Sequence, residues 1–169
     1  MHGIPTLLKC ISKLEKKGYK SKFIFSGSGY YQDKILDYST FCNISLKKPI
    51  SFQHSSDGYK NNAISLVTLD SQMYGLAVPS KAYSCMANGR KFVYLGPPNS
   101  ELHRLLIENK KLGWFANIND ESECFELFKK IIEEKPSSHH SEYSYLEKIL
   151  GENVILDKIT SHLLDSRTN

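Results

Sequence analysis

Hydrophobic residues recur with two different periods along this chain, and the two periods alternate. Helical periodicity, with apolar residues every three or four positions, marks residues 4–17, 31–38, 79–87, 99–109 and 120–133, and a more polar helix is predicted at 51–60. Short apolar runs typical of buried strands lie between them, at 22–26, 43–46, 63–69, 91–95 and 113–116. Strands that alternate with helices predict an α/β fold, with a Rossmann-like parallel sheet flanked by helices.

The first predicted element is a helix and not a strand. Its apolar face consists of Ile4, Leu7, Leu8, Ile11 and Leu14, and Gly18 is a natural helix stop. An alternating fold normally opens with a strand, whose following turn faces the ligand. The pattern therefore predicts that the first strand of the sheet is absent from this sequence.

The alternating pattern ends near residue 134, which predicts the organisation of the chain. We expect residues 1–134 to form one Rossmann-like domain. Residues 135–141 are rich in Pro, Ser and His and are typical of a linker. Two helices are predicted beyond it, at 143–150 and 153–164, and residues 135–169 are expected to pack on the same domain.

Composition and charge exclude several functional classes. The 169 residues are 40% hydrophobic and 24% charged, which fits one globular domain. The net charge of +4 comes from lysines scattered through the periodic segments, so nucleic acid is not a predicted partner. No apolar run approaches the roughly 20 residues that span a bilayer, so any contact with a membrane is expected to be peripheral.

The cysteines and histidines do not predict a metal site or a redox motif. Cys10, Cys42, Cys85 and Cys124 are widely spaced among apolar neighbours, as expected of reduced thiols in a cytoplasmic protein core. His139, His140 and His162 lack the spacing of metal ligands and are interpreted as surface residues.

The segment from Tyr74 to Arg90 carries the strongest chemical signal. Pro79 suits the first position of a helix and keeps Val78 extended. The unpaired amides of such a helix start, with the helix dipole, match a diphosphate. Lys81 is electrostatically misplaced in a first turn unless an anion lies nearby. The alternative is a surface lysine that extends into solvent.

Two further turns follow predicted strands. Gly27 and Gly29 lie in a strand-to-helix turn that would let backbone approach a phosphate, although a plain turn explains them equally well. Glu101 lies in the first turn of a helix for which Asn99 is the predicted N-cap. Its carboxylate suits sugar or ribose hydroxyls, or it complements the helix dipole without any ligand. Trp114 is expected at a sheet edge, where it packs or stacks on a ligand.

Taken in order, these segments resemble the C-terminal, donor-binding domain of GT-B glycosyltransferases of the family 4 type, especially their bacterial cell-surface polysaccharide branch. The resemblance covers residues 1–133, and its most specific part is Pro79-Ser-Lys81 leading into Ala87-Asn-Gly-Arg90. The other matching segments are Gly3 to Leu8, Phe23 to Gly29, Ile64 to Leu69, Gly75 to Lys81, and Ser100-Glu101 through Gly113-Trp114.

The resemblance implies a domain that binds a nucleotide-diphosphate sugar at the carboxyl ends of its strands, opposite an N-terminal acceptor domain. It implies no obligatory metal and no other cofactor, because helix amides and basic side chains neutralise the leaving diphosphate. It also implies a cytoplasmic enzyme, at the inner membrane surface where its acceptor is lipid-linked. The residues that it assigns to donor binding are Gly27, Gly29, Gly75, Leu76, Val78, Pro79, Ser80, Lys81 and Glu101.

The sequence departs from the family pattern in ways that affect function. The two glutamates that many members carry in this segment correspond to Met73 or Tyr74 and to Lys81, and only His2 stands near the basic residues of the first strand. The acceptor half is absent, so no catalytic residue is assigned and the isolated domain is expected to be inactive. A separate polypeptide that carries the acceptor domain is therefore a predicted partner.

Two other functions fit parts of the sequence. A non-catalytic binding or scaffolding module derived from a glycosyltransferase is compatible with an exposed sheet edge. A nicotinamide-dependent oxidoreductase is supported only by Gly27 and Gly29, without the third glycine or the following acidic residue of the dinucleotide motif.

Overall fold

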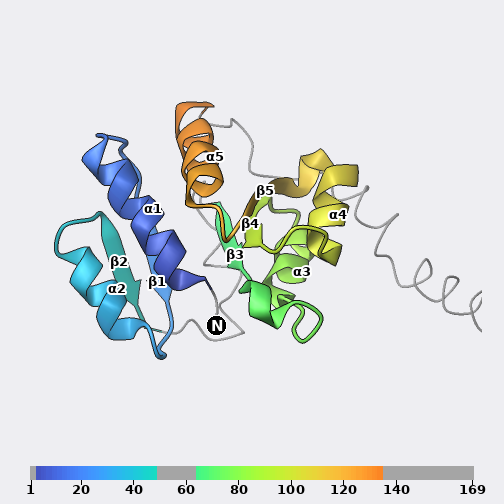
Figure 1. The fold of residues 1–169 in the computed structure, drawn as a ribbon, viewed down its shortest axis with the longest axis horizontal. Coiled ribbons are helices and arrows are strands. Elements are labelled where there is room, and N and C mark those ends of the chain that lie inside the picture. The colour runs from blue at the N-terminus through green and yellow to red at the C-terminus, as the bar shows by residue number, and fades with distance from the viewer. Residues whose placement is uncertain (1–2, 49–63, 135–169) are drawn as a thin grey trace, which may run out of the picture.

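The computed structural model describes residues 3–48 and 64–134, and these form an α/β domain with parallel strands (Figure 1). The predicted helix at 51–60, both C-terminal helices, His2 and the three C-terminal histidines lie outside the described residues. The helices are α1 (Ile4–Lys16), α2 (Gln32–Ser39), α3 (Ser80–Ala87), α4 (Glu101–Glu108) and α5 (Glu121–Glu134). The strands are β1 (Phe23–Ser26), β2 (Ile44–Lys47), β3 (Ser65–Thr68), β4 (Phe92–Gly96) and β5 (Gly113–Asn117). Two short 3-10 helices, η2 (Ser71–Met73) and η3 (Lys110–Leu112), precede α3 and β5.

The predicted fold class is confirmed, with one difference in the sheet. All strand pairs are parallel, but the strands form two sheets: β1 pairs with β2, and β3, β4 and β5 form a second sheet in that order. Figure 1 shows β1 and β2 to the left of β3, β4 and β5, with α1 packed beside α5. Among the described residues, no strand bridges β1 and β3.

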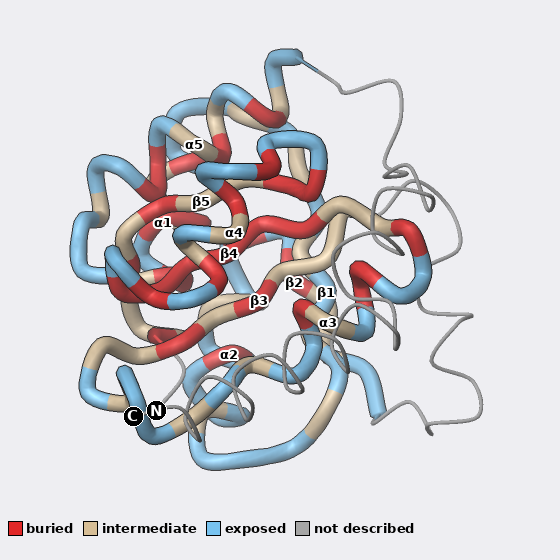
Figure 2. Tube along the Cα trace, turned by 90° about the vertical axis from the view of Figure 1, so that its right-hand side faces the viewer, coloured by how far each residue is buried: buried red, intermediate tan, exposed pale blue. Residues whose placement is uncertain are grey.

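The two sheets share one hydrophobic core. Its buried residues come from α1, α2, α5 and the facing sides of the strands in both sheets, and a second cluster joins α3 and α4 to the other face of β3 and β4. Helices therefore cover both faces of the three-stranded sheet, as expected for parallel strands. Figure 2 shows buried residues concentrated along β4, where every position is buried, and on α1 and α5.

Helix α1 ends as the sequence predicts. Gly18 has a φ of +81°, its N–H donates to the Glu15 carbonyl, and the Tyr19 N–H donates to the Leu14 carbonyl. This pair of bonds is the Schellman arrangement, which favours glycine because its φ is positive. The apolar face of α1 is buried as predicted, with only Ile4 partly exposed.

All four cysteines are buried, which confirms their interpretation as core residues. Cys10 on α1 and Cys124 on α5 lie together where these helices meet. The Cys10 thiol donates a hydrogen bond to the Glu121 carbonyl (3.5 Å), and the Cys124 thiol donates to the Asn117 carbonyl (3.2 Å). These contacts connect α1 to the end of β5 and the start of α5.

Two helix starts differ from the sequence prediction by one position. Pro79 is the N-cap of α3 and not its first residue, since its ψ of 87° is not helical. Asn99 is not the N-cap of α4, because it has a φ of 64° and the cap is Ser100, whose hydroxyl accepts from the His103 N–H at 3.3 Å. A buried Tyr94 hydroxyl accepts from the Ser100 hydroxyl at 3.2 Å, which holds Ser100 in the capping position.

Candidate functional site

The turns that follow β1, β3, β4 and β5 all lie at the carboxyl ends of parallel strands. In Figure 1 the turn after β1 and the segment from η2 to α3 lie along the lower side of the molecule. This edge is where open α/β sheets bind ligands, because helix N-termini and strand ends meet there. The sequence-predicted site residues lie on three of these turns: Gly27 and Gly29, Gly75 to Lys81, and Glu101.

The loop from β3 to α3 has a defined shape. Asp70 caps η2 by accepting from the Gln72 N–H at 3.0 Å, and the chain then turns at Gly75, whose φ is +76°. The Leu76 and Ala77 amides both donate to the Met73 carbonyl, at 3.0 and 3.1 Å. Since no atom lies within 4 Å of a Cβ placed on Gly75, the glycine serves the backbone conformation and not close packing.

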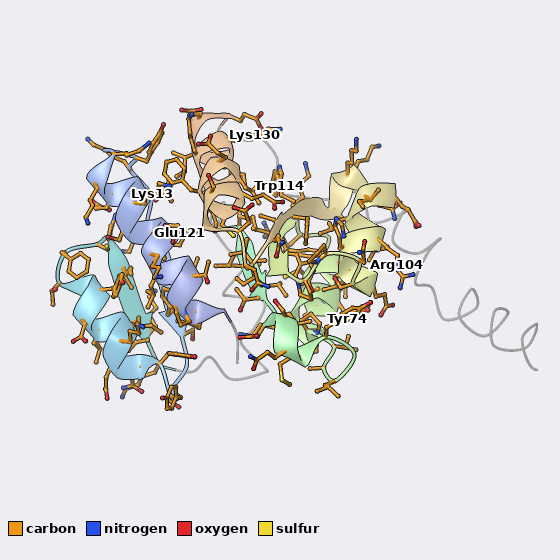
Figure 3. All side chains as sticks on the ribbon, in the orientation of Figure 1. Lys13, Tyr74, Arg104, Trp114, Glu121 and Lys130 are labelled. Atoms are coloured by element: carbon orange, nitrogen blue, oxygen red, sulfur yellow. The ribbon has the colours of Figure 1, made fainter. Side chains whose placement is uncertain are left out.

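Two neighbouring turns hold this loop in place. The Tyr74 hydroxyl donates to the Asn99 carbonyl at 3.3 Å, and the Asn119 side-chain amide donates to the Ser71 hydroxyl at 2.6 Å. Figure 3 shows Tyr74 on the side of the molecule that carries α3 and α4, away from β1 and β2. These contacts join the carboxyl ends of three adjacent strands, so the loop is supported by the sheet.

The start of α3 is open to solvent. Ser80 and Lys81 are exposed, and among the described residues no side chain caps this helix. Leu76 and Val78, which precede it, expose 78% and 64% of their surface. The corner at Pro79 is therefore not filled by described side chains, which leaves its amides accessible to an anion.

Glu101 has a partner within the protein. Its carboxylate lies beside the Tyr83 hydroxyl of α3, and it raises the pKa of that phenol together with burial, which is the larger cause. Glu101 also lies in the first turn of α4, where its negative charge interacts favourably with the helix dipole. It therefore connects α3 to α4 at the strand ends, in the position that the sequence pattern predicts for it.

Gly27 and Gly29 are at the same edge but on the other sheet. Both have positive φ, at +138° and +155°, and a Cβ added to either would meet no atom within 4 Å. The hydrogen bonds found in the described residues join the β3–α3 loop, through Ser71 and Tyr74, to the turns after β4 and β5, and none joins it to the Gly27–Gly29 turn. The structure thus brings Glu101 to the α3 corner but leaves the two glycines across the gap between the sheets.

The residues that support the loop were not among those predicted from the sequence. His103 accepts from the Asn99 N–H through Nδ1 at 2.8 Å, and its ring lies 3.8 Å from that of Phe115, so it fixes the turn after β4. Asn119 does the same for the turn after β5. For Asn119, which follows β5 closely, a polar residue after a predicted strand was the available signal, since all such turns share one edge of a parallel sheet. No such signal marks His103, which lies inside α4.

Trp114 lies on β5, an edge strand among the described residues, as predicted. Lys91 Nζ lies 5.9 Å from its ring centroid, which is within cation-π range.

A separate depression of about 310 Å³ is lined by Ile107 to Lys111, between α4 and the start of β5. It is therefore at the amino ends of the strands, opposite the candidate site.

Neither a metal centre nor a membrane span is found in the part of the chain that the structure describes. No group of three or more His, Cys, Asp or Glu side chains there could hold a metal ion. No helix there combines the length and the apolar character needed to cross a membrane.

Comparison with known proteins gives one relationship. The chain is 28% identical, over 162 residues, to the probable glycosyltransferase WbjE of Pseudomonas aeruginosa. The match covers 88% of this chain and 40% of that protein, so the chain spans less than half the length of its relative. No family model and no solved structure matches the chain.

Proposed function

We propose that this chain is the donor-binding half of a glycosyltransferase of the GT-B, family 4 type. The similarity to a probable glycosyltransferase carries the proposal, because it extends over nearly all of this α/β domain and over less than half of the relative. A half of this kind binds a nucleotide-diphosphate sugar and needs an acceptor half for transfer to a polysaccharide or lipid-linked acceptor. It would act in the cytoplasm, at the inner membrane surface where the acceptor is lipid-linked.

The start of α3 is the proposed diphosphate site. The open amides of Ser80 and Lys81 lie at the positive end of the helix dipole, and the Lys81 ammonium adds a full charge in the same turn. Gly75 gives the preceding loop the turn that places Leu76 and Val78 at its rim, where their exposed side chains can cover a ribose or a base.

The same groups account for leaving-group stabilisation without a metal. In glycosyl transfer the bond between the anomeric carbon and the diphosphate oxygen breaks, and its electron pair leaves with the diphosphate. Amide donors and an ammonium group that face that oxygen in the bound donor would stabilise the added charge. Glu101 would accept a hydrogen bond from a sugar or ribose hydroxyl when that hydroxyl replaces the Tyr83 hydroxyl as its partner. The Gly27–Gly29 turn would form the opposite wall of the donor site. No residue of this half is assigned as the catalytic base.

Calorimetric titration of the full chain with UDP and GDP tests the site. Ser80→Pro removes one amide donor at the first helical position, where proline is tolerated, and Lys81→Gln removes the charge. We expect each to weaken diphosphate binding about tenfold, which corresponds to one hydrogen bond to a charged group. Lys9→Gln is the matched control, because Lys9 is exposed in the middle of α1. Equal losses in all three variants, or no loss in the first two, would contradict the site.

The second candidate is a non-catalytic module that associates with a partner protein. Within residues 3–48 and 64–134, β1 and β3 each have one edge without a pairing strand, which favours it, since exposed strand edges promote association. Sugar transfer measured with the acceptor half alone, and then with both halves mixed, separates the two functions. Activity restored only in the mixture supports the donor-binding half, whereas nucleotide-independent association without transfer supports the module.

A further inference from the structure

Helix α4 begins with a capping arrangement that is shifted by one residue. The Ser100 hydroxyl accepts from the His103 N–H at 3.3 Å, which is the first half of a capping box. In a complete capping box, the side chain three positions after the cap accepts from the amide of the cap itself. Here His103 Nδ1 accepts from the amide of Asn99, one residue earlier, at 2.8 Å. The His103 side chain therefore holds the turn that precedes the helix.

This turn offers one backbone donor for such a contact. Pro97 and Pro98 have no N–H, so Asn99 supplies the first amide after β4. Within residues 3–48 and 64–134, Asn99 is also the one residue other than glycine with a positive φ, at 64°. The left-handed conformation costs free energy in an L-residue, although Asn tolerates it better than most. The hydrogen bond to His103 offsets part of that cost and favours this conformation of the turn.

The conformation of Asn99 matters for a second loop. The Asn99 carbonyl accepts from the Tyr74 hydroxyl at 3.3 Å. Tyr74 lies in the β3–α3 loop and directly precedes Gly75, where the loop turns with a φ of +76°. Figure 3 shows Tyr74 just below α4. The backbone of one residue, Asn99, thus connects the His103 ring to the loop that leads into α3.

The His103 ring is itself held by the sheet. Its centroid lies 3.8 Å from that of Phe115 on β5, with 30° between the two planes. The Tyr94 ring lies 5.8 Å from the same Phe115 ring, and its hydroxyl accepts from the Ser100 hydroxyl. A ring that packing already orders loses little further conformational entropy when its nitrogen accepts a hydrogen bond. His103 is therefore suited to fixing the position of another group.

We propose that His103 is the positioning residue for the β3–α3 loop. Its Nδ1 atom holds Asn99 in the left-handed conformation, and the Asn99 carbonyl holds the loop through Tyr74. As a contribution to donor binding, this role rests on the proposed diphosphate site at Gly75 to Lys81, because a loop free to move must be ordered when the nucleotide binds. The effect on the loop itself is measurable without nucleotide.

Two substitutions separate the acceptor atom of His103 from its ring. His103→Phe keeps an aromatic ring against Phe115 but has no acceptor. His103→Asn loses the ring but keeps an acceptor, since its side-chain oxygen stands at the same number of bonds from the backbone as Nδ1. Positioning through the hydrogen bond requires the Asn variant to behave like the native chain. A residue that only packs in the core would show the opposite order.

Residue-resolved amide exchange of the full chain without nucleotide is the first measurement. The Leu76 and Ala77 amides donate to the Met73 carbonyl within the loop, at 3.0 and 3.1 Å. We expect both to exchange about fivefold faster in His103→Phe, as for the loss of one hydrogen bond, and at the native rate in His103→Asn. The Val93 amide reports global unfolding in the same samples. Native rates in the Phe variant, or equal acceleration in both variants, would overturn the proposal.

Tyr74→Phe tests the other end of the connection. It removes the hydroxyl that reaches Asn99 and leaves His103 unchanged, and we expect the same acceleration at Leu76 and Ala77. The double variant with His103→Phe should show no further acceleration, because both substitutions break one connection. Multiplied effects would mean that the two residues act on the loop independently, against the proposal. Tyr74 is exposed, so its substitution remains a test even where His103→Phe does not fold.

Calorimetric titration of the same proteins with UDP and GDP reports separately on the donor site. We expect His103→Phe and Tyr74→Phe to weaken binding about fivefold, and His103→Asn to bind as the native chain does. The expected order in amide exchange, with no nucleotide binding by the native chain, would support the role of His103 and refute the donor site. Native binding that His103→Phe leaves unchanged would refute the contribution of His103 to donor binding and leave the donor site intact.

Discussion

At the scale of single residues, two glycines occupy positive φ for different reasons. A Cβ on Gly113 would lie 1.9 Å from the Phe92 carbonyl oxygen, which is backbone of the adjacent strand, whereas a Cβ on Gly18 would meet no atom within 4 Å. We expect Gly113→Ala to lower the free energy of unfolding by roughly 2–4 kcal/mol, because β4 and β5 must move apart. Urea unfolding followed by circular dichroism measures it.

Gly18→Ala is the matched control for that substitution. It forces alanine into the left-handed region without a steric contact, so we expect a loss of only about 1 kcal/mol. Similar losses in the two variants would show that the close approach at Gly113 is not a determinant of stability.

Tyr94 predicts a dependence of stability on pH. Burial raises the pKa of its phenol above the ordinary value of 10.0, and the hydrogen bond with Ser100 opposes this only in part. The folded state therefore holds its proton more tightly than the unfolded state. Stability is fully retained below pH 10 and falls as the pH rises from there through the folded-state pKa. In urea unfolding, the free energy of unfolding of Tyr94→Phe should fall less steeply between pH 9 and 11 than that of the native chain. Parallel plots of this free energy against pH for the two proteins would contradict the contribution of Tyr94.

Residue identities at the site could be predicted only where the backbone alone determines them. Gly18 has the positive φ that its place after a predicted helix suggests. The predicted starts of α3 and α4 each differed from the observed start by one residue. At α4 the reason is that Ser100, and not Asn99, is held by a hydrogen bond to the Tyr94 hydroxyl. The pairing of Glu101 with Tyr83 is likewise a tertiary contact that no local pattern encodes.

At the scale of elements, the start of α4 depends on a small buried network. The Ser100 hydroxyl accepts from the His103 amide and donates to Tyr94, and Ser100 is only 5% exposed. We expect Ser100→Ala to cost about 1–3 kcal/mol, because it removes the cap and leaves the Tyr94 hydroxyl without its partner. Thermal and urea unfolding measure this cost.

A double-mutant cycle with Tyr94→Phe separates the two parts of that cost. In the Tyr94→Phe background no hydroxyl is left unpaired, so Ser100→Ala should cost less there than in the native chain. Additive costs would mean that the two hydroxyls do not interact.

The elements themselves were predictable from the sequence because their apolar periods are strong. The described helices and strands lie within about two residues of their predicted limits, which is the usual uncertainty of element ends. The arrangement of strands in two sheets was not predictable from the strand segments, since Phe23 to Ser26 and Ser65 to Thr68 have the same apolar character whether or not they have a neighbour.

At the scale of the whole molecule, one hydrophobic core joins two sheets that differ in strand pairing and in burial. Strand β4 is paired on both sides and buried at all five positions. Within the part of the chain that the structure describes, strand β1 pairs with β2 alone and has alternating exposure, and α2 buries only Ile35. The link between the halves runs through α1 and α5, whose side chains contact both sheets.

This asymmetry predicts that β1, α2 and β2 open as a unit at lower free energy than β4. A two-stranded sheet is marginal by itself, and local opening is easiest where few apolar groups are buried. In native-state hydrogen exchange at increasing urea, we expect the Phe23 and Gly27 amides, which donate to the β2 side, to exchange by an opening below the global free energy of unfolding. Val93 and Tyr94 should require global unfolding. If the opening free energies of all four amides equal the global free energy of unfolding at every urea concentration, the two sheets unfold as one cooperative unit. In that case β1 and β2 would already be as stable as an interior pair of strands, and the gap would impose no energetic cost.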